Sequence, residues 1–245
     1  MQYKETEFFG FKQIIFEFDN KKATLVFPKN PREDKKWCFK TEYFDAFPKF
    51  QIEMLKKGYY VAHVQNEKRW CLDTDTERQA NFAKFLHKEF GLFEKFMTIG
   101  MSCGGMQSVY LAAKHPELVA AIYIDAPVIN FLSAPCGIGD GDNYAYNEFV
   151  NARGLTKKDL IGFRKHPQDY IPNLIENKIP MFLIVGDSDK LVPFEENAIH
   201  LVNAYKKAGL EFSFVLKEGC DHHPHGLDDN TPLFEFAEKY YGSIK

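Results

Sequence analysis

The stretch Phe96-Met-Thr-Ile-Gly-Met-Ser-Cys-Gly-Gly-Met106 decides how the rest of the chain is interpreted. It begins as a short apolar run typical of a buried strand, and a helix-forming segment follows at 107–114. Between the two, Gly100-Met-Ser-Cys-Gly104 fits the pattern G-x-S-x-G. The glycines on either side of Ser102 leave room for a tight, strained turn. The context predicts a strand–turn–helix with Ser102 as a nucleophile; a glycine-rich helix start used for packing or anion binding is the alternative.

Outward from this stretch, apolar strands alternate with amphipathic helices. We expect strands at 59–64, 96–99, 119–124, 180–185 and 211–216, and helices at 43–57, 74–90, 107–114, 195–208 and 233–241. Strands that are apolar on both faces and separated by helices indicate a mostly parallel sheet covered on both sides. Segments 12–19 and 23–27 alternate like an antiparallel pair. The sequence therefore predicts a doubly wound α/β fold in one domain, residues 1–245.

One segment interrupts this alternation. Residues 127–177 hold three closely spaced glycines and two weak helices near 157–165 and 168–176. Because about fifty residues between two core strands exceed an ordinary connection, we predict a small cap or lid insertion here. Its aromatic side chains are candidates either to line an acyl or sugar pocket or to pack the lid itself: Phe131, Tyr144, Tyr146 and Phe149.

A nucleophilic serine needs a base, and an imidazole base needs a carboxylate that fixes its tautomer. Both residue types follow predicted strands further along the chain. Gly186-Asp-Ser-Asp189 comes after one strand, and Gly219-Cys-Asp-His-His-Pro-His225 comes after the next. The order serine, aspartate, histidine, each on a loop after a strand, is the order that a hydrolase of this architecture requires.

With these residues the chain resembles the α/β-hydrolase-fold serine hydrolases, close to bacterial esterases and to dienelactone-hydrolase-like and prolyl-oligopeptidase-like enzymes. Three stretches carry the resemblance: G-M-S-C-G-G at 100–105, G-D-S-D-K-L-V-P at 186–193 and E-G-C-D-H-H-P-H-G-L at 218–227. In such proteins the second aspartate of the middle stretch is the acid, which implies Asp189. The histidine follows a glycine by two or three positions, which implies His222.

Two alternatives stay open within this triad. Asp187 competes with Asp189 as the acid, although an aspartate at that point of a turn more often binds the amides of the turn itself. His223 competes with His222 as the base, and His225 is expected on the loop or the rim of the site. The histidine run also invites a metal interpretation, which we disfavour because neither HExxH spacing nor a nearby cysteine pair accompanies it.

An oxyanion hole requires two N–H donors. One is expected from Cys103, the residue after the nucleophile, and the other from the loop after the strand at 23–27. Many relatives carry a His-Gly pair in that loop, whereas this chain has Pro28-Lys-Asn-Pro-Arg-Glu-Asp-Lys-Lys-Trp37. We name Trp37 as the second donor, with a buried aromatic as the alternative role. The Cys103 thiol itself is expected to pack against the sheet. The charged side chains that we consider as contacts for a polar substrate are Lys40, Glu42 and Arg69.

Composition and charge exclude several classes of protein. The 245 residues carry 31 Lys and Arg against 34 Asp and Glu, so there is no polycationic surface for nucleic acid or an anionic membrane. The N-terminus has neither the basic nor the apolar part of a secretory signal, and no run approaches the ~20 apolar residues of a membrane span. Five dispersed cysteines suggest reduced thiols. We therefore expect a cytoplasmic protein without nucleic-acid or membrane partners; a homo-oligomer is compatible with the sequence.

These observations lead to one favoured function. We predict hydrolysis of a small-molecule ester, with a small acyl group or a carbohydrate, through an acyl-enzyme on Ser102, with His222 as base, Asp189 as acid and no metal or organic cofactor. A prolyl-oligopeptidase-like serine peptidase is the second hypothesis. A non-catalytic binding protein of the same fold is the third, although a binding protein would have no need of all three triad residues.

Overall fold

A nine-stranded sheet with the order β1-β2-β3-β5-β4-β6-β7-β8-β9 forms the centre of the computed structural model, which describes residues 2–244. Its strands are β1 Tyr3–Phe8, β2 Phe11–Phe18, β3 Lys21–Val26, β4 Trp37–Lys40, β5 Tyr60–Val64, β6 Phe96–Met101, β7 Val119–Asp125, β8 Met181–Gly186 and β9 Ser213–Lys217. From β5 to β9 across the sheet all neighbours run parallel, whereas β1, β2, β3 and β5 pair antiparallel. The predicted fold, a mostly parallel sheet with an antiparallel N-terminal part, is confirmed.

The burial of each strand explains this division. Every residue of β6, β7 and β8 is buried, as expected for strands with helices on both faces. In β2 buried residues alternate with exposed or half-buried ones along most of the strand, which suits an antiparallel strand with one wet face.

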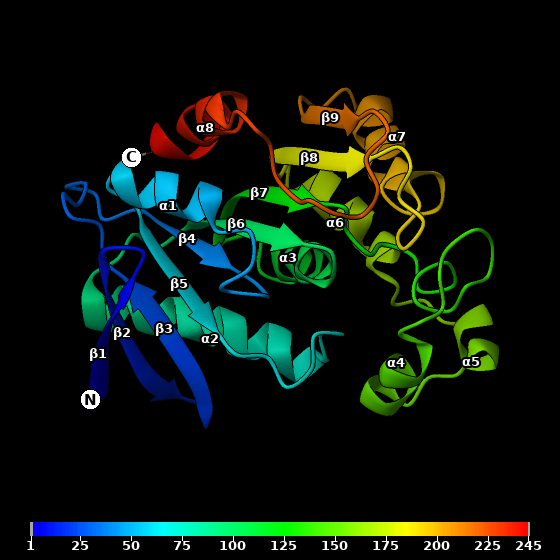
Figure 1. Ribbon diagram of the computed structural model, residues 1–245, viewed down its shortest axis with the longest axis horizontal. Coiled ribbons are helices and arrows are strands. Elements are labelled where there is room, and N and C mark those ends of the chain that lie inside the picture. Colours follow the sequence, from blue (N-terminus) through cyan, green and yellow to red (C-terminus); the bar gives the residue numbers. More distant parts are fainter. Residues whose placement is uncertain (1, 245) are drawn as a thin grey trace.

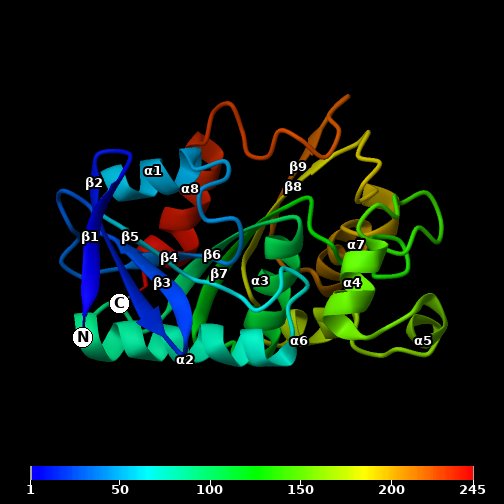
Figure 2. The same cartoon turned by 60° about the horizontal axis from the view of Figure 1, so that its bottom comes forward.

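Helices cover both faces of the sheet (Figures 1 and 2). Figure 2 shows α1 (Lys49–Lys56) and α8 (Thr231–Ala237) above the sheet, and α2 (Asp73–Phe90) below it. The helix that follows β6, α3 (Cys103–Lys114), packs on β6 and β7. Next to it, α6 (Ile171–Glu176) packs on α3, and α7 (Ile199–Ala208) packs on α6. The buried side chains consequently form two hydrophobic clusters, one on each face. Short helical turns complete the elements: η1 Pro167–Tyr170, η2 Phe194–Glu196 and η3 Glu238–Gly242.

The segment between β7 and β8 has two parts. Its first part carries α4 (Tyr146–Arg153) and α5 (Lys157–Ile161), which lie at the lower right of Figure 1 away from the sheet. Its side chains Phe131, Phe149 and Leu160 belong to a third hydrophobic cluster, which also includes residues of α3 and of the β5–α2 loop, and we call residues 127–165 the cap. Its second part, η1 and α6, packs on α3 and so belongs to the helical layer of the sheet.

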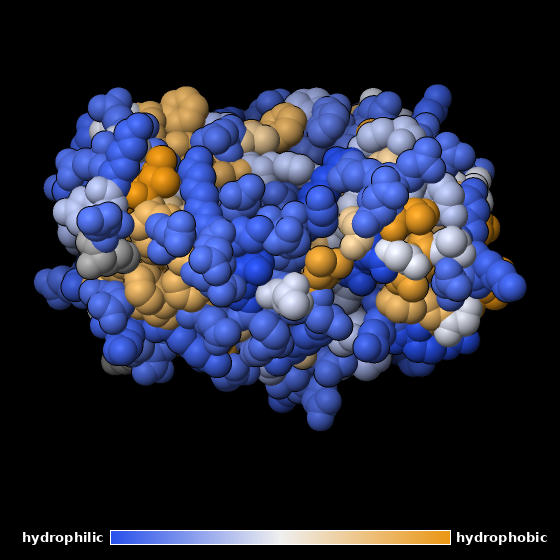
Figure 3. All heavy atoms as spheres, turned by 90° about the horizontal axis from the view of Figure 1, so that it is seen from below, coloured by the Kyte–Doolittle hydropathy of each residue, from blue (hydrophilic) through white to orange (hydrophobic). Residues whose placement is uncertain are grey.

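Two polar contacts tie the cap to the loop between β5 and α2. The Arg69 guanidinium donates through Nε to the Glu148 carboxylate of α4 at 2.7 Å, and Arg153 donates to the carbonyl oxygens of Trp70 and Cys71. Seen from below, the surface is largely hydrophilic, with hydrophobic side chains gathered toward its two ends (Figure 3). Ile161 of the cap is 68% exposed, so hydrophobic surface remains on α5.

The structure differs from the sequence-based assignment in several elements, among them α4, which the sequence does not predict. Strands β1 and β4 are additions to it, since β1 is mostly polar and β4 has only four residues, all buried. The helix expected at 43–57 begins only at Lys49, because Tyr43 and Phe47 have positive φ and Pro48 precedes the first turn. The segment 41–48 is therefore a loop after β4.

No helix within residues 2–244 combines the length and the apolar character needed to cross a bilayer. All five cysteines are unpaired, and four of them are buried.

Candidate active site

The predicted turn after β6 holds Ser102 in a strained conformation. Ser102 has φ 54° and ψ −117° and immediately precedes α3. The glycines around it are required by close packing: a Cβ on Gly100 would overlap the Gly104 carbonyl and the Ser108 hydroxyl, and one on Gly105 would lie 2.6 Å from Pro127 Cβ. Backbone strain of this kind persists only where the surrounding structure imposes it, and it is typical of functional sites.

Loops at the carboxyl ends of parallel strands bring three side chains together. The His222 Nε2 atom lies 3.0 Å from Ser102 Oγ, and His222 Nδ1 lies 2.7 Å from Asp189 Oδ2. Asp189 and His222 are buried, with side chains 1% and 6% exposed. Because a carboxylate only accepts hydrogen bonds, Nδ1 carries the proton and Nε2 presents its lone pair to the serine hydroxyl. This is the arrangement needed for a base that removes the proton of Ser102.

The second carboxylate oxygen fixes Asp189 in place. Asp189 Oδ1 accepts the amides of Leu191 at 2.9 Å and Val192 at 2.8 Å. The competing Asp187 points elsewhere: its carboxylate accepts the Gly219 amide at 2.8 Å and the Ser188 hydroxyl at 2.9 Å, so it braces its own turn. The geometry thus brings Asp189, and not Asp187, to the histidine.

The other two histidines of the run take different places. His223 is exposed, and its ring stacks on Phe47 with the centroids 5.5 Å apart. His225 is buried, not on a rim, and its Nδ1 lies 2.8 Å from Asp125 Oδ1 at the end of β7. The site therefore holds a second histidine–aspartate pair beside the first, with the rings of His222 and His225 5.0 Å apart.

The elbow also places one predicted oxyanion donor. Cys103 is the first residue of α3, so its amide N–H has no acceptor within the helix and lies at the positive end of the helix dipole. Its thiol is buried, and burial raises the pKa of Cys103 to about 11, which keeps the thiol protonated at neutral pH.

The prediction of Trp37 as second oxyanion donor is wrong. Its backbone amide donates to the Tyr241 hydroxyl at 2.9 Å and its indole N–H donates to the Phe93 carbonyl at 3.0 Å. Trp37 also begins β4, at the amino end of the sheet, whereas Ser102 follows the carboxyl end of β6. The tryptophan is a fully buried aromatic, which was the alternative role.

The loop beside the serine is the one after β4. β4 is paired with β6, and a Cβ on Gly104 would lie 3.2 Å from Glu42 Cβ. Tyr43 lines the same cavity as Ser102, and the Tyr43 amide lies 3.4 Å from the carboxylate of Glu42. The loop after the strand at 23–27 does not fill this place because β5 and β4 lie between β3 and β6 in the sheet. The apolar run Trp37-Cys-Phe39 is the local trace of β4 in the sequence, but it is too short to show a period.

A cavity of about 210 Å³ opens onto Ser102. Its lining is aromatic, apolar and basic: Tyr43, Ala46, Phe47, Arg69, Met101, Tyr144, His222, His223 and His225. Among the aromatic residues considered from the sequence, only Tyr144 reaches this cavity, because Phe131 and Phe149 pack the core of the cap and the Tyr146 hydroxyl accepts the Lys157 amide. A larger cavity of about 430 Å³ lies on the other side of His225.

The three charged residues proposed as substrate contacts have different roles. Arg69 lines the cavity, and its guanidinium is paired with Glu148 of the cap through Nε and Nη2, which leaves Nη1 for a substrate. The Glu42 carboxylate is occupied by the side-chain amides of Asn66 at 2.9 Å and Gln107 at 2.7 Å. Lys40 is fully buried behind the site, with Nζ 3.2 Å from the Ala46 carbonyl. Of the three, only Arg69 remains as a candidate contact.

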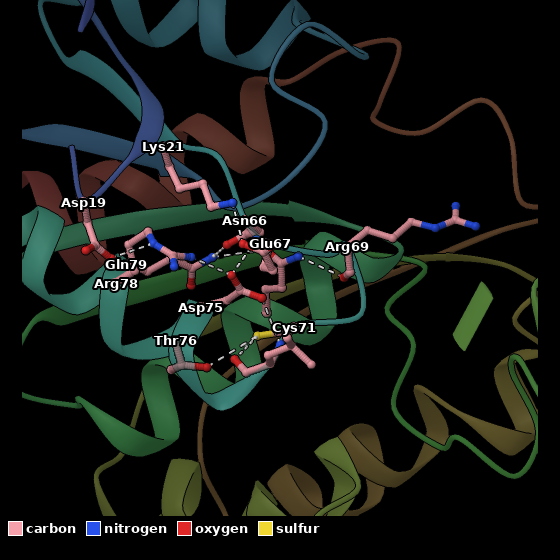
Figure 4. A network of polar contacts seen from close by, with 12 residues as sticks. Asp19, Lys21, Asn66, Glu67, Arg69, Cys71, Asp75, Thr76, Arg78 and Gln79 are labelled. Atoms are coloured by element: carbon pink, nitrogen blue, oxygen red, sulfur yellow. Dashed lines mark hydrogen bonds and ion pairs between the residues drawn. The ribbon is translucent and has the colours of Figure 1, made fainter. Parts of the chain in front are cut away.

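A buried polar network holds the loop that presents Arg69 (Figure 4). The Asp75 carboxylate accepts the amides of Glu67 and Leu72, and Arg78 bridges it to Asp19 of the β2–β3 turn. In Figure 4 the Arg69 side chain points away from this network. The loop is thus anchored on one side while its arginine is directed toward the cavity and the cap.

The buried Lys40 is expected to make the free energy of unfolding of the protein depend on pH. Burial lowers the pKa of Lys40 to about 7, and the nearby Asp125 carboxylate partly opposes this shift. A buried lysine with a depressed pKa costs folding free energy in full below pH 7, and the cost falls as the pH rises toward the ordinary value of 10.5. Lys40→Met, which keeps the shape, should therefore stabilise the protein more at pH 6 than at pH 9, by on the order of 2 kcal/mol.

Urea unfolding of both proteins at the two pH values measures this difference. For each protein, the free energy of unfolding at pH 6 is subtracted from that at pH 9. This difference cancels the pH-independent cost of losing the hydrogen bond from Lys40 to Ala46. An equal effect of the substitution at both pH values would contradict a depressed pKa at Lys40.

Comparisons with known proteins identify the family of this chain. The sequence model of the prolyl oligopeptidase family matches residues 56–243. The chain is 30% identical over 127 residues to the mouse acylamino-acid-releasing enzyme, a match covering 49% of this chain and 15% of that protein. The acylaminoacyl peptidase of Pyrococcus horikoshii has a similar structure, with a TM-score of 0.72 at 17% identity over 100% of this chain and 43% of that one.

A second type of hydrolase shares the fold. The S-formylglutathione hydrolase of Agrobacterium tumefaciens gives a TM-score of 0.66 at 13% identity, and the match covers 91% of this chain and 93% of that one. The chain spans less than half the length of the two peptidases. Since the family match includes most of the chain and the elbow within it, we conclude that this protein belongs to the prolyl oligopeptidase family.

Proposed function

We propose that Ser102, His222 and Asp189 form a catalytic triad that hydrolyses a carboxylic acyl bond. The observation that carries this proposal is the continuous chain of hydrogen bonds from Ser102 Oγ through the imidazole to the buried Asp189 carboxylate. The strained backbone of Ser102, at the amino end of α3, supports the same role.

In the proposed reaction, Ser102 Oγ attacks the acyl carbonyl while His222 Nε2 takes its proton. Asp189 stabilises the imidazolium that forms, and the imidazolium then protonates the leaving group. The Cys103 amide donates to the oxyanion, and we place the second donor in the main chain of 42–43, where the Tyr43 amide makes only a long hydrogen bond of 3.4 Å to Glu42 Oε1. The same imidazole then takes a proton from a water molecule, which attacks the acyl-enzyme. The imidazole finally gives this proton to Ser102 Oγ as the acid product leaves.

For the substrate we propose a short peptide or an acylated amino acid, so the scissile bond is an amide. The family assignment and the two acylamino-acid-releasing relatives support this choice over the ester favoured from the sequence. The size of the cavity beside Ser102, about 210 Å³, suits a small side chain, since pockets for drug-sized ligands start at about 300 Å³. Arg69 is placed to contact a polar group of such a substrate.

Hydrolysis of carboxylic esters is the second candidate. The observation in its favour is the likeness to S-formylglutathione hydrolase, which extends over nearly the full length of both chains. The same triad serves either reaction, because both proceed through an acyl-enzyme and differ in the leaving group.

A matched pair of substrates separates the two functions. N-acetyl-alanine p-nitroanilide and N-acetyl-alanine p-nitrophenyl ester share one acyl group and differ in the scissile bond. We expect turnover of both, with both rates abolished in Ser102→Ala. Turnover of the ester alone would contradict the peptidase proposal and leave an esterase. Turnover of neither, by folded protein, would contradict both.

A further inference from the structure

Three imidazoles form a triangle at the mouth of the site. The ring centroids of His222, His223 and His225 lie 4.8–5.0 Å from one another. One ring nitrogen of each residue lies within 4.8 Å of the corresponding nitrogens of the other two. The triad accounts for only one of these histidines.

Two of the rings are already oriented as metal-binding histidines are. Asp189 holds Nδ1 of His222 at 2.7 Å, and Asp125 holds Nδ1 of His225 at 2.8 Å. In protein metal sites the ring nitrogen that does not bind the ion usually donates to a carboxylate in this way, which fixes the tautomer and strengthens the ligand. Both residues therefore present Nε2 as the nitrogen with the lone pair.

The third ring is not held by a carboxylate. His223 is exposed, and within residues 2–244 neither of its ring nitrogens has a hydrogen-bond partner. A tetrahedral zinc ion with Zn–N distances of about 2.0–2.1 Å needs nitrogens roughly 3.4 Å apart, so the triangle has to contract. Rotation of the exposed His223 side chain, off the face of Phe47, shortens the two separations that involve His223, and the third depends on a shift of the His222 and His225 rings toward each other.

We infer that His222, His223 and His225 bind one divalent transition-metal ion of the Zn²⁺ type, through a nitrogen of each ring. Imidazole nitrogen is a preferred ligand of zinc, copper and nickel, and three histidines leave a fourth position open. The buried carboxylates of Asp125 and Asp189 place negative charge behind two of the ligands, which favours a bound cation.

Such an ion would inhibit the enzyme. His222 Nε2 has a single lone pair, which either accepts the proton of Ser102 or binds the metal. With the ion bound, the base is occupied and the serine keeps its proton. This consequence rests on the proposed function, whereas binding of the ion does not.

Titration calorimetry with Zn²⁺ on chelator-treated protein tests the binding itself. We expect one ion to bind per chain. The dissociation constant should be at least about 10-fold larger in His223→Ala and in His225→Ala than in the wild type. His200→Ala removes an exposed histidine of α7 and should leave the affinity within twofold of wild type. Ser102→Ala should also bind normally, so a failure of the proposed catalysis does not affect this test. His223 is exposed, so the His223→Ala variant leaves the buried pair of His225 and Asp125 intact and should fold normally.

Inhibition provides a second, separate readout. The concentration of Zn²⁺ that halves p-nitrophenyl ester hydrolysis, relative to each protein's own rate, should rise at least tenfold in His223→Ala. Unchanged affinity in both histidine variants, or affinity lost in Cys220→Ser instead, would overturn the site. Zinc binding that depends on the histidines but leaves hydrolysis unaffected would overturn the inhibitory role.

Discussion

Replacing Ser102 by alanine should reduce kcat/KM for p-nitrophenyl acetate by at least about 10³-fold, because within residues 2–244 the Ser102 hydroxyl is the hydrogen-bond partner of His222 Nε2. The fold should be unaffected: the side chain of Ser102 makes its hydrogen bond to His222, and alanine has the same backbone preferences in the strained turn. A low activity with an unchanged melting temperature would therefore report on chemistry and not on stability.

Ser188→Ala is the matched control for this substitution. Ser188 is exposed on the loop after β8, and its hydroxyl donates to Asp187. Its variant should keep activity within about twofold. Turnover by Ser102→Ala within a few-fold of wild type would remove Ser102 from the reaction.

The second large effect is expected from Asp189→Asn, a loss of kcat of about 10⁴-fold. This is the size of the loss in serine proteases of unrelated fold, where the asparagine amide stabilises the wrong imidazole tautomer. Here the amides of Leu191 and Val192 hold the Oδ1 position as an acceptor. The NH₂ group of an asparagine would therefore face His222 Nδ1 and favour a proton on Nε2, which cannot then accept from Ser102.

Asp187→Asn provides the comparison within the same loop. An asparagine oxygen still accepts the Gly219 amide and the Ser188 hydroxyl, so the loss should stay below about tenfold. Steady-state kinetics of both variants on one substrate decides which of the two aspartates is the acid of the triad. A severe effect at Asp187 with a mild one at Asp189 would exchange their roles.

The features that could be predicted from the sequence are those encoded within short stretches. The elbow depends on glycines close to Ser102, and the parallel core depends on runs such as 180–185 that are apolar on both faces. The loops of Asp189 and His222 could be placed because each follows a predicted strand, and parallel strands bring their carboxyl ends to one edge. The choice of Asp189 over Asp187 and of His222 over His223 came from the resemblance to hydrolases of this fold.

The features that escape prediction depend on contacts between distant segments. Four buried residues are too few to reveal β4 by periodicity, and without β4 the second oxyanion donor is sought after the wrong strand. The partnership of His225 with Asp125 joins residues a hundred positions apart, since Asp125 ends β7 and His225 lies in the loop after β9, with β8 between the two strands. Trp37 is misplaced for the same reason, since its partners Tyr241 and Phe93 lie far from it in sequence.

The central claim is that Ser102 is an activated nucleophile, and a fluorophosphonate probe tests it most directly. Intact-protein mass spectrometry should detect one adduct per chain, peptide mapping should place it on Ser102, and Ser102→Ala should remain unlabelled. The absence of an adduct on folded, chelator-treated protein, or an adduct on another residue, would contradict the account.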